Sequence, residues 1–161
     1  MRRLLDLLRA NARMSTREIA KRLGKTAREV EAQIERLERT GVIRGYHAVV
    51  NPDREPGPAP VLGIIEVKVA PQRGVGFDAV ATRICRHREV HTCYLISGDA
   101  DLVLLVEGKS LQEVADFVAQ RLSGIEGITA TSTHFLLRKY KEYGVMLHGD
   151  GDDTERLPVT P

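Results

Sequence analysis

The sequence predicts an α+β fold made of two parts. Residues 1–50 carry apolar side chains at helical spacing, whereas from residue 61 on, runs of β-branched residues alternate with amphipathic stretches. Between them, residues 51–60 contain four prolines, which exclude a helix or inner strand and indicate a semi-rigid linker. We therefore expect a helical domain at 1–50, a mixed domain at 61–147 and a flexible acidic tail at 148–161.

Two capping boxes identify the first part as a helix-turn-helix. Ser15 precedes Glu18 by three residues, and Thr26 precedes Glu29 by three. In such pairs the hydroxyl and the carboxylate bond the free N–H groups at a helix start. Gly24 lies where a tight turn would join the two helices. We expect helices at 2–10, 16–23 and 27–40. A short strand pair, the wing, is expected to follow at 42–50.

Charge is divided unevenly along the chain. Residues 1–50 hold 12 Lys and Arg against 6 Asp and Glu, whereas the remainder holds 12 against 16, which together give the net charge of +2. Because the basic surplus coincides with the helix-turn-helix, we interpret this part as a surface for double-stranded DNA. The alternative is that these arginines only form a solvated helix surface.

Composition limits the cellular setting. No apolar run reaches 18 residues and the N-terminus lacks the features of a signal peptide, so neither a membrane span nor secretion is expected. The only cysteines are Cys85 and Cys93, too few for a disulfide framework, which indicates reduced thiols in the cytoplasm.

The second part follows the order βαββαβ, a ferredoxin-like arrangement. An antiparallel sheet with helices on one face leaves the other face to be covered, so we expect a partner subunit there and at least a homodimer. The strands are expected at 61–69, 90–96, 102–106 and 128–137, and the helices at 77–86 and 111–122.

Over residues 4–145 the sequence resembles the Lrp/AsnC family of transcription regulators. No single motif is specific, but their order and spacing together are. They are Leu4-Leu5 with Leu8, Asn11-Ala12-Arg13, Ser15 with Glu18-Ile19-Ala20, Arg36-Leu37-Glu38 before Gly41-Val42-Ile43, Ser97-Gly98-Asp99-Ala100-Asp101-Leu102, and Gly127-Ile128 with Thr131 and Thr133. The resemblance implies a sequence-specific, non-enzymatic regulator without a cofactor. Its second domain would oligomerise, up to a tetramer or octamer, and bind a small effector, commonly an amino acid.

The resemblance also places an effector pocket at a subunit interface. Asp99 or Asp101 could bind the ammonium of an amino acid, while glycine N–H groups and threonine hydroxyls could bind its carboxylate. The alternative is that Gly98 and Asp99 only form a hairpin turn. The effector residues implied are Gly98, Asp99, Ala100, Asp101, Thr131, Thr133 and His134.

DNA would be bound by phosphate contacts and read by the start of the third helix. Arg28 is the first candidate for a bidentate pair with guanine, since it points away from the apolar face of that helix. The base-reading candidates are Lys25, Thr26, Ala27, Arg28 and Ala32. The phosphate candidates are Arg13, Arg17, Lys21, Arg36, Arg39 and Arg44.

This chain departs from the family pattern in three places. It begins about half a dozen residues late. Gln33 stands where an arginine is common, beside several glutamates, so the DNA face is less basic than usual. Ala100 stands where a large aromatic is common, which would alter the effector pocket.

Two other functions and a metal site are alternatives to a specific regulator. An architectural DNA-binding protein without an effector would show little sequence preference. A tetrapyrrole-pathway decarboxylase of related fold is disfavoured by the Ser-Gly-Asp-Ala-Asp hairpin and the basic helix-turn-helix. Four residue types that bind zinc occur close together, but the turn between them opposes their convergence, so no metal is expected. They are Cys85, His87, His91 and Cys93.

Overall fold

The computed structural model describes residues 1–70 and 76–147, and the chain divides into two compact units, residues 1–49 and a second that begins at Val50. Within the described ranges, no helix is long and apolar enough to cross a membrane. The predicted acidic tail at 148–161 lies outside the described residues.

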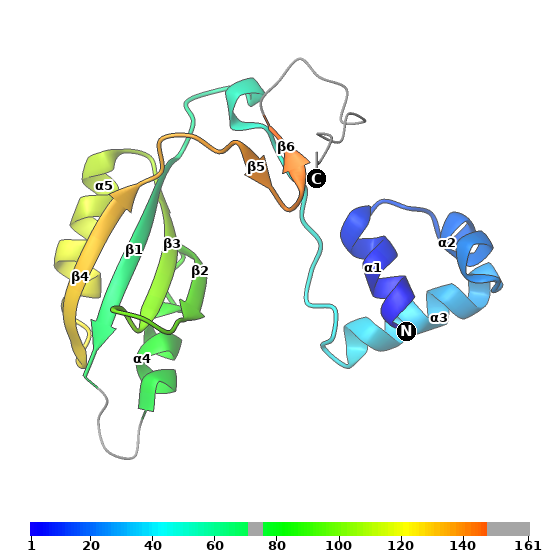
Figure 1. Ribbon diagram of the computed structural model, residues 1–161, viewed down its shortest axis with the longest axis horizontal. Helices are drawn as coiled ribbons and strands as arrows, with labels where there is room; N and C mark the ends of the chain where they lie inside the picture. The colour runs from blue at the N-terminus through cyan, green and yellow to red at the C-terminus, as the bar shows by residue number, and fades with distance from the viewer. Residues whose placement is uncertain (71–75, 148–161) are drawn as a thin grey trace, which may run out of the picture. The chain divides into compact units, whose positions relative to one another are not determined.

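The first unit is a bundle of three short helices, shown in blue to cyan in Figure 1. They are α1 (Arg2–Ala10), α2 (Thr16–Leu23) and α3 (Ala27–Arg39), which match the predicted bounds to within one residue. Apolar side chains three, four or seven positions apart share one face of each helix, and these faces together form the core. The buried residues are Leu4, Leu8, Ile19, Ala20, Val30 and Leu37.

Both predicted capping boxes are confirmed. The Ser15 hydroxyl accepts a bond from the Glu18 N–H at 3.2 Å, and the Glu18 carboxylate accepts one from the Ser15 N–H at 3.1 Å. At α3 the corresponding distances between Thr26 and Glu29 are 3.2 and 2.8 Å. Gly24 between the helices has φ +65°, a conformation that favours glycine. The turn and both helix starts are therefore specified locally.

The strand pair predicted over 42–50 does not form. The backbone N–H groups of Val42 and Ile43 instead donate to the Leu37 carbonyl at 2.9 and 3.1 Å, which closes the end of α3. The Tyr46 hydroxyl donates to the Glu38 carboxylate at 2.9 Å. These bonds hold the segment against α3, and no described residue of the chain forms a strand beside it.

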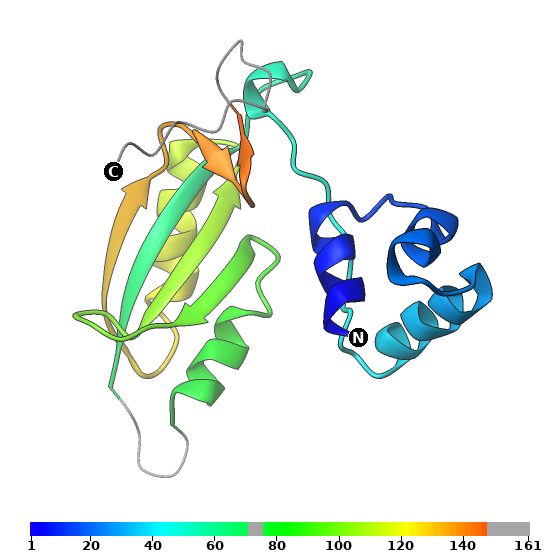
Figure 2. The same cartoon turned by 45° about the vertical axis from the view of Figure 1, so that its right-hand side comes forward.

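The second unit contains the predicted βαββαβ order (Figure 1). Its four-stranded sheet has the order β2-β3-β1-β4, and every pair of neighbouring strands is antiparallel. Helices α4 and α5 lie on one face, as the turned view in Figure 2 also shows. The elements are β1 (Val61–Val69), α4 (Gly76–Ile84), β2 (Val90–Leu95), β3 (Leu102–Gly108), α5 (Leu111–Asp116) with the π-helical η2 (Phe117–Leu122), and β4 (Ile128–Phe135).

The core of this unit lies between the sheet and its helices. Alternate residues of β1 and β3 point to the helices, because side chains of a strand alternate between faces. Two glycines allow α5 to approach the sheet closely: a Cβ at Gly63 or Gly108 would lie 2.9 Å from a methyl of Val114. The buried core residues are Ile65, Val67, Val69, Val80, Ile84, Leu102, Leu104, Val106, Val114, Phe117 and Leu122.

Three details differ from expectation. The helix predicted at 111–122 changes at Phe117 to π-helical winding, and the Ser123 N–H bonds the Val118 carbonyl five residues back. A two-stranded hairpin, β5 (Lys141–Glu142) and β6 (Val145–Met146), follows β4 and was not predicted, because two-residue strands leave no periodicity. The linker contains the 3₁₀ turn η1 (Pro52–Arg54).

Candidate DNA interface and effector site

Three of the five predicted base-reading residues are exposed on α3 or just before it. Val30 and Leu37 are buried in the core, so the opposite side of the helix faces solvent. Arg28 and Ala32 are exposed there, and Lys25 is exposed two residues before the helix. This arrangement leaves an arginine near the helix start available for a base edge.

The two other predicted base-reading residues are already engaged. The Thr26 hydroxyl donates to the Glu29 carboxylate at 2.7 Å and accepts a bond from the Glu29 N–H. Ala27 is half-buried at the first position of α3. In this structure these residues position the start of the helix.

The predicted phosphate-binding side chains are spread over the first unit, from the residues before α2 to the segment after α3. All six are exposed: Arg13, Arg17, Lys21, Arg36, Arg39 and Arg44. Positive side chains on the surface of a helix-turn-helix attract the phosphate backbone and release its counterions. The unit thus offers the electrostatic surface that non-specific DNA affinity requires.

Several glutamates of the first unit are engaged in structural bonds. Hydrogen bonds from the Ser15 N–H and hydroxyl lower the pKa of Glu18, and those from Thr26 lower the pKa of Glu29. Glu38 binds the Tyr46 hydroxyl, and the pKa of Tyr46 is raised by burial and then by that contact. Sequence reasoning missed the contact between Tyr46 and Glu38, because it joins a helix to the loop that follows it.

The face of the sheet opposite the helices has an apolar centre and is called the open sheet face below. Leu62, Ile64, Val103 and Leu105 are only half-buried there, and Tyr94 on β2 is 61% exposed. The strand register brings Ile64 beside Leu105 and Tyr94 beside Val103. An uncovered apolar centre of this kind is typical of an interaction surface.

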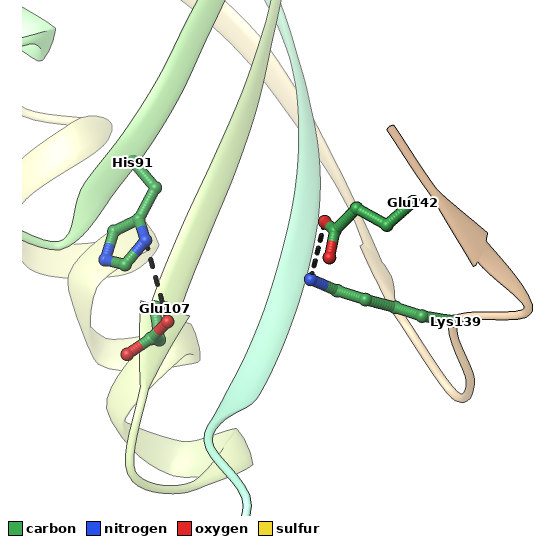
Figure 3. Close-up of polar contacts among 4 residues, drawn as sticks. All are labelled: His91, Glu107, Lys139 and Glu142. Atoms are coloured by element: carbon green, nitrogen blue, oxygen red, sulfur yellow. Dashed lines mark hydrogen bonds and ion pairs between the residues drawn. The ribbon is translucent and has the colours of Figure 1, made fainter. Parts of the chain in front are cut away.

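Polar pairs lie around this centre. His91 Nδ1 is 3.6 Å from Glu107 Oε2 across β2 and β3 (Figure 3). Figure 3 also shows the ion pair of 2.8 Å between Lys139 and Glu142, which ties residue 139 to the β5–β6 hairpin. On β4, Ser132 Oγ and His134 Nε2 are 3.3 Å apart.

The hairpin that carries the predicted effector residues holds two different carboxylates. Asp101 accepts a bond from the Val69 N–H at 2.8 Å, and its own N–H donates to the Val67 carbonyl at 3.0 Å. These bonds tie the hairpin to the end of β1. Asp99 is exposed, and Gly98 before it has φ +139°. Ala100 is buried, with only 5% exposed.

The remaining predicted effector residues divide between the two faces of β4. Thr131 and Thr133 pair with Val67 and Ile65, whose side chains are buried against the helices, so both threonines point to the helix side. His134 pairs with Ile64 and lies on the open sheet face. Within one chain, the structure therefore does not bring these residues to a single site with the hairpin.

A metal centre finds no support in the part of the chain that is described: no group of three or more His, Cys, Asp or Glu could hold a metal ion there. His87 instead contacts the Phe117 ring edge-on, with 5.4 Å between ring centroids. Cys85 and Cys93 are free thiols.

Both units match known families. Residues 1–44 match the winged helix-turn-helix DNA-binding domain, and residues 62–146 match the Lrp/AsnC ligand binding domain. The chain is 42% identical to the HTH-type transcriptional regulator YugG of Bacillus subtilis over 98% of its own length and 95% of that protein.

Solved structures agree with this assignment. The leucine response regulatory protein of Mycobacterium tuberculosis is 26% identical, with a TM-score of 0.71 over 91% of this chain and 97% of that one. A feast or famine regulatory protein from M. tuberculosis, complexed with L-methionine, is 28% identical, with a TM-score of 0.67 over 88% and 92%. The chain therefore belongs to the Lrp/AsnC family and is a DNA-binding transcriptional regulator that senses a small effector.

Proposed function

We propose that α3 selects the operator sequence, with Arg28 as the principal base-reading residue. The observation that carries this proposal is the exposure of Arg28 and Ala32 opposite the buried Val30 and Leu37. An arginine at this position can donate two bonds to a guanine edge in the major groove. The surrounding cationic side chains then supply the affinity that does not depend on sequence.

The proposed effector is an amino acid or a related metabolite. The relative complexed with L-methionine supports this class of ligand. Asp99 is the proposed partner of the ligand ammonium, because its carboxylate is exposed whereas that of Asp101 binds the Val69 N–H. His134 lies on the open sheet face, so a second subunit that covers this face would complete a pocket around it, whereas the two threonines point to the helix side of β4 and lie outside that pocket.

A homodimer formed through the open sheet face would supply that subunit. The half-buried apolar side chains on β1 and β3 are otherwise left in contact with water, and their burial favours association. We place the protein in the cytoplasm, where its DNA target lies, and assign no catalytic role to the second unit.

The decisive experiment is fluorescence anisotropy of the purified full chain on DNA from upstream of its own gene and on random DNA. Each titration is run with and without a pool of the twenty amino acids. Selective binding that shifts with the pool would support the proposal, and dividing the pool would identify the ligand. Equal affinity for random DNA together with indifference to the pool would instead support an architectural protein.

An Asp99→Asn variant separates effector binding from DNA binding. We expect it to keep the DNA affinity measured without effector and to lose the shift that the amino-acid pool produces. Asp78→Asn is the matched control, because Asp78 is an exposed carboxylate on α4. An unchanged response in Asp99→Asn would remove Asp99 from the proposed site.

A further inference from the structure

Two cysteines lie side by side where the end of α4 meets β2. Cys85 directly follows α4, and its N–H still bonds the Ala81 carbonyl at 2.9 Å. Cys93 on β2 pairs with the buried Leu104, so its side chain points to the helix side of the sheet and packs against the core. Cys85 lies close enough to Cys93 to affect the pKa of its thiol.

The chain between these cysteines is held by its own backbone bonds. The N–H groups of Arg86 and His87 donate to the carbonyls of Arg83 and Ile84 at 3.3 and 3.1 Å, and the Val90 N–H donates to the His87 carbonyl at 3.1 Å. His87 also contacts Phe117. These bonds hold the segment between the two cysteines as a structured turn.

The two thiols differ in accessibility. Cys85 is exposed to solvent, whereas Cys93 is only partly exposed. Burial, and then the contact with Cys85, raises the pKa of Cys93 to about 11. The thiolate is the form that reacts with an oxidant. Cys93, which is less exposed, therefore reacts more slowly than Cys85 with an oxidant in solution.

We propose that Cys85 and Cys93 form a reversible intramolecular disulfide when the protein meets a hydroperoxide. The Cys85 sulfur attacks the peroxide and the O–O bond breaks, which gives Cys85 sulfenic acid and releases an alcohol, or water from hydrogen peroxide. The Cys93 sulfur then attacks the Cys85 sulfur, the S–O bond breaks, and the hydroxyl leaves as water with the Cys93 proton. Two thiols are oxidised and one peroxide is reduced.

The bond would connect α4 to an edge strand of the sheet. Forming it shortens the distance between the sulfurs to about 2.05 Å. It would fix the end of α4 to β2, which carries Tyr94 on the open sheet face and leads into the hairpin at 96–101. This oxidation site is separate from the proposed DNA and effector residues, and its test does not depend on them.

The test treats the reduced full chain with about one equivalent of hydrogen peroxide, blocks the remaining thiols by alkylation and measures the mass. We expect loss of both alkylation sites, a mass about 2 Da below that of the unblocked reduced chain, and recovery of both thiols with dithiothreitol. Trypsin cleaves after Arg83, Arg86, Arg88 and Lys109, so the linked product is the peptide 84–86 joined to 89–109.

Two serine variants distinguish the roles of the sulfurs. Cys93→Ser should accumulate sulfenic acid on Cys85, which dimedone traps, whereas Cys85→Ser should leave Cys93 at least about tenfold less reactive than Cys85 in the wild type. Circular dichroism checks that both variants fold. The proposal is overturned if the wild-type thiols oxidise independently, if Cys85 proceeds to the sulfinic acid with Cys93 unchanged, or if the product is an intermolecular disulfide.

Discussion

Asp99 and Asp101 stand two positions apart in one hairpin, yet their carboxylates meet different surroundings. Asp101 bonds the Val69 N–H and so joins the hairpin to β1, while Asp99 is exposed. Residue type alone did not distinguish them, because both suit a turn and both suit an ammonium partner. The bond from β1 engages Asp101 and leaves the Asp99 carboxylate available to a ligand.

Replacing Arg28 tests how DNA is read. We expect Arg28→Ala to weaken binding to the operator by about 5- to 150-fold, the equivalent of about 1–3 kcal/mol, because a bidentate base contact is lost. Binding to random DNA should change far less. The control is Arg9→Ala, which removes an exposed arginine that pairs with Asp6 on α1. An equal loss on both DNAs would make Arg28 a phosphate contact.

We expect any side chain at position 63, where the chain has Gly63, to destabilise the fold. A Cβ there would lie 2.9 Å from Val114 Cγ1, so Gly63→Ala should lower the free energy of unfolding by about 1–3 kcal/mol through overpacking. Urea denaturation measures the change. Gly124→Ala is the control, since its Cβ would meet nothing closer than 3.7 Å. An unaltered Gly63→Ala midpoint would show that Val114 shifts aside freely.

At the scale of elements, α2 and α3 each begin with a carboxylate whose pKa is lowered. Glu18 and Glu29 have pKa values lowered from the ordinary value of a glutamate, because each accepts hydrogen bonds from the residue that caps its helix. A lowered pKa stabilises the fold above the unfolded value, and this contribution disappears as the pH falls through the folded value. Acid should therefore loosen these two helices.

The corresponding prediction uses Glu18→Gln with Glu29→Gln. Glutamine also fits a capping box, so the helices should form at neutral pH, but their stability should no longer fall on acidification below about pH 4.5. Amide hydrogen exchange measured helix by helix checks this, with α4 as the internal reference. Equal acid sensitivity in the wild type and the double variant would assign the effect to other carboxylates.

At the scale of the whole molecule, the open sheet face sets the expected assembly. Leu105→Glu places a charge between Ile64 and Thr92 and should convert the proposed dimer to monomers in sedimentation velocity, because burying an unpaired charge is costly. Operator affinity should fall with it. Leu111→Glu is the control, since Leu111 is 56% exposed on α5. If both variants are monomers, or if both remain dimers, the open sheet face is not the interface.

Much of the fold follows from local patterns in the sequence. The capping pairs Ser15–Glu18 and Thr26–Glu29 specify two helix starts within four residues each, and alternation along 61–69 specifies a strand. The wing was the main error. Its apolar, β-branched residues favour a strand, but backbone bonds to the Leu37 carbonyl prevailed in the folded chain.

The sequence by itself determined where the helices of the first unit begin, the βαββαβ order and the basic character of the DNA-binding unit, because these depend on neighbours within a few residues. The tertiary structure decided which distant residues meet. Asp101 reaches Val69 across 32 positions, and Cys85 lies near Cys93 because α4 packs against the face of the sheet to which Cys93 points. Strand register and helix packing set such contacts, and neither is written in a local pattern.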